Sequence, residues 1–597
     1  MDQPASSSSS LGSRIPPWLR SAAPWVSLVV LNALFVLPAV IRELPRQPLL
    51  LLRPCGDALV IVALCAITAK FRYAAWVRRA ALTVGFVLWL YMWICVIGLT
   101  IVRQEPLLYD QLFLAKHVGV LIMDLWSVFR AVVLIVVLAL LGLLGWLGLR
   151  LFRWLVNTLA SGPPLRTGGI TLGLLVVMVG SSAAIGRMPT SGGRYTAGVV
   201  WTTPAMSRNL GKSMEIYARI QRGIEGSPYA RYREQFRLER KPDVQLFLVE
   251  SYGRILFSHP EIAADWHDRL THYGERLDEA GWHVVSGFSE APVSGGGSWM
   301  AEATLLTGIK VRYESVFRHL VDDVANTPNL VRFLDANGYQ TILLAPKDRA
   351  RPGAVLENRY AYDTTVFALD LEYEGPSIGW GIIPDQYSLG FAHDNVFSRA
   401  DGPIFTNFHM VSSHAPWSIV PSVVDDWRVL GEPSADEEGP GPELTVDAAS
   451  LKEVGDRVRH FRRFKAPRYA YMGEVSGLQL DSFVATIDYD LEVLTSHLES
   501  VEGDKLVIIM GDHQPPLVSD ANESYDVPVH VFSRDPQLLE EFRDDGFVDG
   551  MVLNNGRPAA MAHEAMFSMV VRALMRCCGE PGTLPPKLRP NGIRIGN

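Results

Sequence analysis

The sequence predicts an N-terminal α-helical bundle of about five membrane spans followed by a C-terminal α/β domain, and two observations favour this division. Of the 597 residues 48% are hydrophobic, and the apolar excess lies almost wholly before Arg187. After Val244, short apolar runs alternate with longer amphipathic segments, which is typical of an α/β sheet. The formal net charge of -8 disfavours a nucleic-acid partner.

The membrane part begins after residues 1–23, which are rich in Ser and Pro and are expected to be a disordered cytoplasmic segment. A helix needs about 20 apolar residues to cross a bilayer. Within a predicted transmembrane domain over 24–186, five runs approach this length, namely 24–42, 55–70, 80–102, 128–149 and 169–186. The second run gives the weakest prediction, because it is short and contains Asp57.

Basic loops predict the orientation of these spans. Arg78 and Arg79 lie between the second and third spans, and Arg150 and Arg153 lie between the fourth and fifth. Both clusters are expected on the cytoplasmic side. An odd number of spans then places everything after Arg187 outside the cytoplasm.

The C-terminal part is expected to begin with a juxtamembrane helical linker over 187–240, with helical spacing from about 204 to 222. An extracytoplasmic domain over 241–597 follows. Its predicted strands, buried on both faces of the sheet, are 244–249, 341–345, 404–408, 505–510 and 527–532. Helices are predicted over 325–337, ending at Gly338, and over 474–499, with a surface insertion at 425–465.

Two of these apolar runs end in residues that suit a metal site. In open α/β sheets, ligands gather at the carboxyl ends of the strands. Glu250 follows the run 244–249, and Asp512 and His513 follow the run 505–510. A carboxylate after a buried strand is costly unless it is paired or coordinated, and Asp and His offer an oxygen and a nitrogen ligand. An ordinary loop carboxylate and an Asp–His turn are the alternative interpretations.

A glycine-rich segment and a histidine pair supply further candidates. Gly295, Gly296 and Gly297 precede Ser298, where a helical pattern begins. Such a turn presents backbone N–H groups to an anion, and its serine is either a helix cap or a metal-activated nucleophile. The run 404–408 leads into His409 and His414, which can contact an anion or move a proton. His414, beside a proline and a tryptophan, is the better candidate.

Together these segments resemble the membrane-anchored branch of the alkaline phosphatase/sulfatase superfamily, in particular the lipoteichoic acid synthase and phosphoglycerol transferase group. The matching motifs are LVES with Glu250, GGGSWMAE with Ser298, SSHAPW with His414, and Gly-Asp-His-x-Pro with Asp512 and His513. The resemblance implies that Ser298 is the nucleophile and that His414 contacts the substrate. It also implies one divalent metal ion on Glu250, Ser298, Asp512 and His513, with Mn²⁺ favoured over Mg²⁺ or Zn²⁺.

The nucleophile is where the sequence departs from the group, whose members usually carry Thr at this position. Thr304 and Thr307 lie nearby and stay alternatives to Ser298. Sulfatases that use formylglycine need a Cys or Ser in a Cys/Ser-x-Pro-x-Arg context. Ser298 lacks that context and no cysteine lies between Cys95 and Cys577, so this chemistry is disfavoured.

Further substrate contacts are expected from the segment APKDRARPG and from Trp417. Lys347, Arg349 and Arg351 supply cations for a substrate phosphate, although a solvated basic loop explains each of them equally well.

The resemblance therefore implies a multi-pass enzyme of a bacterial-type inner membrane. Its expected reaction moves a phosphoglycerol-type group from a membrane phospholipid donor to a glycan or lipid acceptor through a serine-linked intermediate. A hydrolase that uses water as acceptor needs the same residues, so it stays an alternative. A non-catalytic sensor or scaffold is the third hypothesis, and it ranks last because every expected ligand is present.

Overall fold

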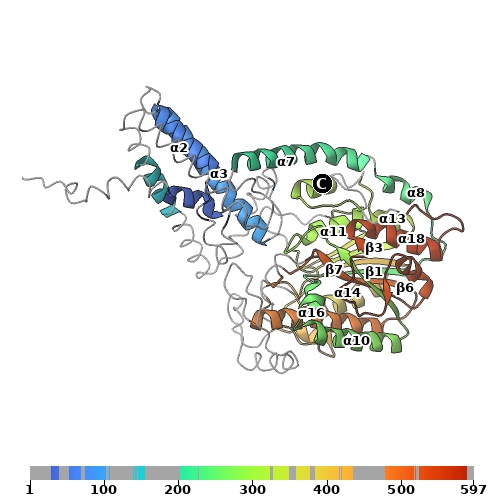
Figure 1. The fold of residues 1–597 in the computed structure, drawn as a ribbon. Coiled ribbons are helices and arrows are strands. Elements are labelled where there is room, and N and C mark those ends of the chain that lie inside the picture. Colours follow the sequence, from blue (N-terminus) through green and yellow to red (C-terminus); the bar gives the residue numbers. More distant parts are fainter. Residues whose placement is uncertain are drawn as a thin grey trace, which may run out of the picture. The chain divides into compact units, whose positions relative to one another are not determined.

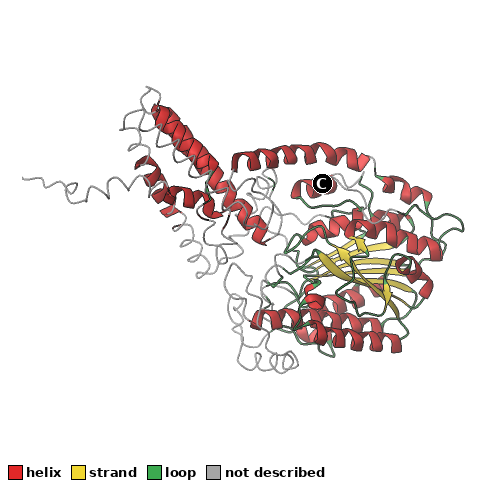
Figure 2. Cartoon of the chain, viewed as in Figure 1, coloured by secondary structure: helices red, strands yellow, loops and turns green. Residues whose placement is uncertain are grey.

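A computed structural model (Figures 1 and 2) describes the two compact units into which the chain divides, 1–98 with 111–211 and 99–110 with 212–597. The structure describes residues 29–38, 40, 51, 53–68, 74–101, 107, 139, 142–143, 145–154, 202–225, 227–322, 327–348, 358–376, 383–415, 417, 420–433, 477–515, 518–519 and 524–587.

The first unit contains apolar helices at the predicted membrane spans. Helix α3 (Ala74–Ile101) includes Ala75–Val96, which is the one stretch in the described residues that is long and apolar enough to cross a membrane. Shorter apolar helices, Val29–Pro38 and Gly56–Cys65, lie within the first two predicted spans. The last predicted span and most of the fourth fall outside the described residues, so the five-span bundle stays a prediction.

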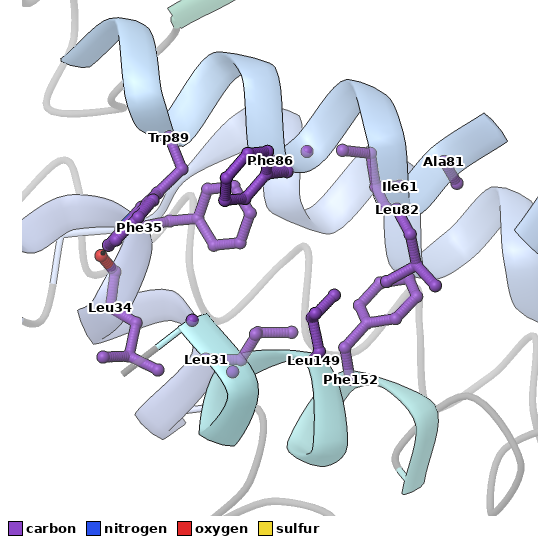
Figure 3. A pocket seen from close by; sticks show the side chains of 13 residues that line it. Leu31, Leu34, Phe35, Ile61, Ala81, Leu82, Phe86, Trp89, Leu149 and Phe152 are labelled. Carbon is purple, nitrogen blue, oxygen red and sulfur yellow. Dashed lines mark hydrogen bonds between the residues drawn. The ribbon is translucent and has the colours of Figure 1, made fainter. Parts of the chain in front are cut away.

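An apolar cavity lies among the helices of this unit (Figure 3). Aliphatic and aromatic side chains from four helical segments of the unit face it, and they include Leu31, Phe35, Ile61, Phe86, Trp89 and Phe152. Leu31, Ile61 and Phe152 also belong to the small buried cluster that holds these helices together.

Asp57, which weakened the prediction of the second span, has a structural role in this unit. It lies at the start of α2 (Gly56–Thr68) and is buried. Its carboxylate accepts hydrogen bonds from Thr202 N and from the Thr203 hydroxyl, both at 2.5 Å. These residues begin the amphipathic helix α7 (Thr202–Glu225), which covers the predicted helical spacing of the linker. A carboxylate at a helix N-terminus satisfies otherwise unpaired N–H groups and complements the helix dipole.

The second unit is built on one sheet, and this confirms the predicted α/β domain. Its strand order in the described residues is β4-β3-β5-β1-β6-β7-β2-β8, with β9 paired to β2. Strands β4, β3, β5, β1 and β6 run parallel, whereas β7 is antiparallel to both of its neighbours. The strands are β1 (Asp243–Val249), β2 (His283–Glu290), β3 (Gln340–Ala345), β4 (Thr364–Phe367), β5 (Ile404–Met410), β6 (Lys505–Gly511), β7 (Asp526–Ser533), β8 (Val548–Asp549) and β9 (Met561–Ala562).

All five predicted strands are present, each extended by one or two residues. The extension of β5 is the one that matters, because it places His409 and Met410 inside the strand rather than in the following loop. Strand β2 was not predicted. Its sequence HVVSGFSE interrupts the apolar run with two serines and Gly287, where the ring of Phe547 lies so close that a Cβ would meet it at 3.1 Å.

Two layers of helices cover the sheet, as Figures 1 and 2 show. Side chains alternate along β1, so Leu246 and Leu248 enter one core while Phe247 and Val249 enter the other. The first layer holds α8 (Tyr232–Gln235), α11 (Ser298–Thr307), α12 (Glu314–Asp322), α13 (Leu330–Ala336), α17 (Glu540–Arg543) and α18 (Met566–Cys578). The second holds α9 (Ile255–Ser258), α10 (Ala263–Glu279), α14 (Asp385–Asn395) and α16 (Gly477–Ser500).

Short 3₁₀ helices complete the second unit, namely η3 (Pro228–Arg231), η4 (Phe397–Arg399), η5 (Trp427–Gly431), η6 (Pro536–Leu539) and η7 (His563–Ala565). Helix α13 begins at Leu330 and not at 325, because the Asn329 side chain caps it by accepting from Arg332 N at 2.9 Å. Helix α16 matches the predicted 474–499 within its described residues.

Candidate active site

Neighbouring parallel strands bring three predicted ligands together. β1 pairs with β6 so that Val249 lies opposite Gly511, and Glu250 and Asp512 follow directly on the two strands. Gly511 permits this junction, because a Cβ there would lie 1.9 Å from the Tyr252 carbonyl oxygen. Glu250, Asp512 and His513 are all buried, and one ligand atom from each lies within 4.8 Å of the others.

Backbone hydrogen bonds fix the orientation of these ligands. Asp512 Oδ1 accepts from Ser251 N at 2.8 Å and from His513 N at 2.7 Å, which leaves Oδ2 toward the cluster. The His513 ring is held through Nδ1, which lies 3.0 Å from the Gln514 carbonyl oxygen. Its Nε2 therefore faces the carboxylates, 3.4 Å from both Glu250 Oε1 and Asp512 Oδ2. A histidine anchored through one nitrogen is typical of a metal ligand.

The glycine-rich loop delivers Ser298 to the same place. Gly295, Gly296 and Gly297 all have positive φ, and Ser298 is the first residue of α11. Such backbone angles favour glycine, which explains three of them in a row. The Ser298 hydroxyl donates to Glu250 Oε2 at 3.2 Å and lies 3.4 Å from His513 Nε2. The structure thus brings all four predicted ligands together.

The charges of the cluster fit a divalent cation. Burial acts to raise the pKa of Glu250, but Lys347, His414 and His513 outweigh it and lower that pKa to about 2. Burial and the neighbouring Glu250 carboxylate raise the pKa of Asp512 to about 6. Two adjoining buried carboxylates repel each other, and a cation held between oxygen and imidazole ligands removes that repulsion.

The two alternative nucleophiles are directed elsewhere. The Thr304 hydroxyl donates to the Met300 carbonyl at 2.7 Å, and the Thr307 hydroxyl donates to the Ala303 carbonyl at 2.6 Å. Both threonines are fully buried within the packing of α11. Of the three hydroxyls, Ser298 is the one beside the carboxylates.

Two predicted substrate contacts lie around this cluster. Lys347 follows β3, and its Nζ lies 3.9 Å from Glu250 Oε2 on a side chain that is 43% exposed. His414 Nδ1 lies 2.6 Å from the Ala415 carbonyl oxygen, which fixes the ring. Burial lowers the pKa of His414, with Glu250 acting in the opposite direction and Lys347 in the same direction.

The other predicted substrate contacts differ from these. Trp417 is buried and has a positive φ, and its indole N–H donates to the Ser413 carbonyl at 2.6 Å while the ring packs on Phe483. In this position Trp417 holds the loop that carries His414. Arg349 and Arg351 lie outside the described residues.

Sequence reasoning missed two contacts at the site. The Ser413 hydroxyl donates to the Glu250 carbonyl at 2.7 Å and so connects the loop that carries His414 to the loop that follows β1. Glu302 accepts from His409 Nε2 at 2.9 Å. Its position one helical turn after Ser298 was the signal in the sequence, because residues four apart share a helix face.

No protein-family model and no curated protein sequence matches the chain. Several solved structures are similar to the chain. One is the lipoteichoic acid synthase LtaP from Listeria monocytogenes, with 16% identity and a TM-score of 0.29 over 49% of this chain and 65% of that one. The chain thus spans just under two thirds of that protein.

Two other similar structures have a TM-score of 0.32 each. The Streptococcus pyogenes phosphoglycerol transferase GacH, in complex with sn-glycerol-1-phosphate, is 13% identical over 60% of this chain and 80% of that one. The zinc complex of the C-terminal periplasmic domain of EptC from Escherichia coli is 11% identical over 56% and 83%.

Proposed function

We propose that this chain is a membrane-bound, metal-dependent transferase that moves a phosphoglycerol-type group from a phospholipid to a glycan or lipid acceptor through a Ser298-linked intermediate. One observation carries the proposal, which is the convergence of the Ser298 hydroxyl with Glu250, Asp512 and His513 from three separate parts of the chain. A serine at a helix N-terminus, beside two carboxylates and an anchored imidazole, suits attack on an anionic phosphodiester.

The donor set fits one divalent cation, with Mn²⁺ our first choice. Glu250, Asp512, His513 and the Ser298 oxygen would hold it. When bound, such an ion lowers the pKa of the serine hydroxyl and neutralises charge on the phosphoryl oxygens.

In the first half-reaction, Ser298 Oγ loses its proton to solvent and forms a bond to phosphorus. The phosphorus–oxygen bond to diacylglycerol breaks, and His414 Nε2 gives a proton to the departing diacylglycerol oxygen. Burial lowers the pKa of His414, but an anionic phosphodiester beside the ring would favour its protonated form. Lys347, next to Glu250, supplies positive charge for the phosphoryl oxygens.

The second half-reaction returns the site to its starting state. His414 Nε2 takes the proton from an acceptor hydroxyl, whose oxygen then bonds to phosphorus. The bond between phosphorus and Ser298 Oγ breaks at the same time, and the serine oxygen takes a proton from solvent, which regenerates the hydroxyl. A membrane anchor would keep the site near its lipid donor and raise the effective donor concentration.

Incubation of the full-length protein with Mn²⁺ and phosphatidylglycerol vesicles tests this proposal. We expect release of diacylglycerol and a mass adduct on the peptide that carries Ser298, and we expect both to be absent from the Ser298→Ala variant. An adduct on Thr304 or Thr307, or full turnover by Ser298→Ala, would contradict the serine-linked intermediate.

The products separate the transferase from the alternatives. Free phosphoglycerol as the only second product, even with glycan and glycolipid acceptors present, would indicate the hydrolase. A folded protein that binds no divalent metal and releases no diacylglycerol would favour the sensor or scaffold.

A further inference from the structure

A third buried carboxylate, that of Glu302, adjoins the candidate site and is not part of the cluster of Glu250, Asp512 and His513. Glu302 is only 5% exposed, on α11. Its Oε1 accepts from His409 Nε2 and from Asn407 Nδ2, each at 2.9 Å. Asn407 also donates to the Tyr362 hydroxyl at 2.9 Å. The pair formed by Glu302 and His409 therefore belongs to a hydrogen-bonded network.

This pair lies on the same side of the sheet as the nucleophile. Asn407 and His409 are two apart on β5 and so project to one face, and His409 lies opposite Leu248 of β1, which enters the core that contains α11. Ser298 and Glu302 are four apart on α11, so their Cβ atoms are about 6 Å apart on one helix face. The imidazole of His409 therefore contacts the helix that begins with Ser298, and it is near enough to Asp512 for that carboxylate to act on its pKa.

The pair leaves one nitrogen of His409 for a ligand. Nε2 is committed to Glu302, whereas Nδ1 has no hydrogen-bond partner among the described residues. The His409 side chain is 26% exposed.

Burial and carboxylates on three different elements act on the pKa of His409. Burial acts to lower its pKa, but Glu302 of α11, Asp348 after β3 and Asp512 after β6 outweigh it, and the net direction is upward. The ring thus keeps its proton more readily than an ordinary histidine does.

We propose that His409 binds an anionic oxygen of the phosphodiester substrate through Nδ1–H, with Glu302 as the positioning residue that holds the ring. This inference deepens the proposed function and rests on it. It assigns a substrate-binding point to β5.

Binding of diethyl phosphate tests this inference. This inert phosphodiester monoanion keeps the same charge across the neutral pH range. Its affinity for the Mn²⁺-loaded, full-length protein is measured for the wild type, His409→Asn, Glu302→Gln and the double variant. His267→Asn, at an exposed histidine of α10, is the matched control.

We expect His409→Asn to weaken binding about tenfold, since it removes one hydrogen bond between charged groups. Glu302→Gln should weaken binding by a smaller factor and add nothing when His409 is already replaced, because it acts only through the ring. His267→Asn should bind as the wild type does.

Equal affinity of His409→Asn and His267→Asn would overturn the inference. If either single variant fails to fold, the double variant decides the matter, because it leaves neither partner buried with an uncompensated charge. Wild-type affinity in the double variant would then also overturn it. A wild type that neither binds diethyl phosphate nor releases diacylglycerol would instead reject the proposed function.

Discussion

Two pairs of buried carboxylates are hydrogen-bonded to the loop that follows β5, Glu250 with Asp512 and Asp385 with Asp490, and the two pairs have different neighbours. Glu250 and Asp512 face His513, Lys347 and the Ser298 hydroxyl. Asp385 accepts from the backbone N–H groups of Val411 and Ser412, at 2.8 and 2.7 Å, while Asp490 interacts with Asp385 and Ser413. In the described residues no ion pair involves Asp385 or Asp490.

The difference in neighbours explains the difference in ionisation. Burial raises the pKa of Asp385 to about 6, although the hydrogen bond to Asp490 acts to lower it. Burial and the charge of Asp385 raise the pKa of Asp490 well above its usual value. A pair with no cation nearby holds a proton between its members. The pair at the site has cationic side chains and a ligand geometry, so it suits a metal ion. Two acids side by side are therefore not in themselves evidence of a metal site.

The largest effect that tests this comparison is expected from Asp512→Asn. Loss of a metal ligand should reduce diacylglycerol release by on the order of 10³-fold or more, and Mn²⁺ binding should fall with it. Asp490→Asn is the matched control, because it changes the same residue type at a buried site outside the cluster. Mn²⁺ binding is measured by equilibrium dialysis. A comparable loss of Mn²⁺ in both variants would contradict the view that only the pair of Glu250 and Asp512 binds a metal ion.

The protonated pair should also give stability a distinct pH dependence. Because the folded-state pKa of Asp385 is raised to about 6, its contribution is fully present below the unfolded value near 4 and is lost as pH rises through 6. A shift of about two units corresponds to about 3 kcal/mol. Asp490→Asn should flatten this part of the profile, as followed by the apparent melting temperature. Parallel profiles for the variant and the wild type would contradict a shared proton.

The sequence was sufficient to predict that Glu250 and Asp512 meet, because both directly follow apolar strands. Parallel pairing of β1 with β6 then brings their ends together. The same logic failed for Asp385 and Asp490, which lie in α14 and α16, where neither residue follows a strand. Their meeting depends on the packing of two helices that are distant in sequence. Glu302 is an intermediate case, since helical spacing relates it to Ser298 but only the extension of β5 brings His409 to it.

Substitution of Trp417 tests whether this side chain stabilises the loop that follows β5. Trp417→Phe keeps most of the packing on Phe483 but removes the indole N–H bond to the buried Ser413 carbonyl. We expect a loss of about 1–2 kcal/mol of unfolding free energy, with KM for the phospholipid little changed. A raised KM with unchanged stability would instead support the predicted contact between Trp417 and the substrate.

The smallest effect is expected from Ser413→Ala, at the residue that touches both pairs. Its hydroxyl donates to the Glu250 carbonyl at 2.7 Å and also interacts with Asp490. Removal should cost about 1 kcal/mol of stability and lower turnover by only a few-fold, because Glu250 keeps its place at the end of β1. Ser413→Thr, which keeps a hydroxyl, is the matched control and should recover part of the loss. If Ser413→Ala lowered Mn²⁺ affinity as much as Asp512→Asn does, the two pairs would be one coupled unit rather than two separate ones.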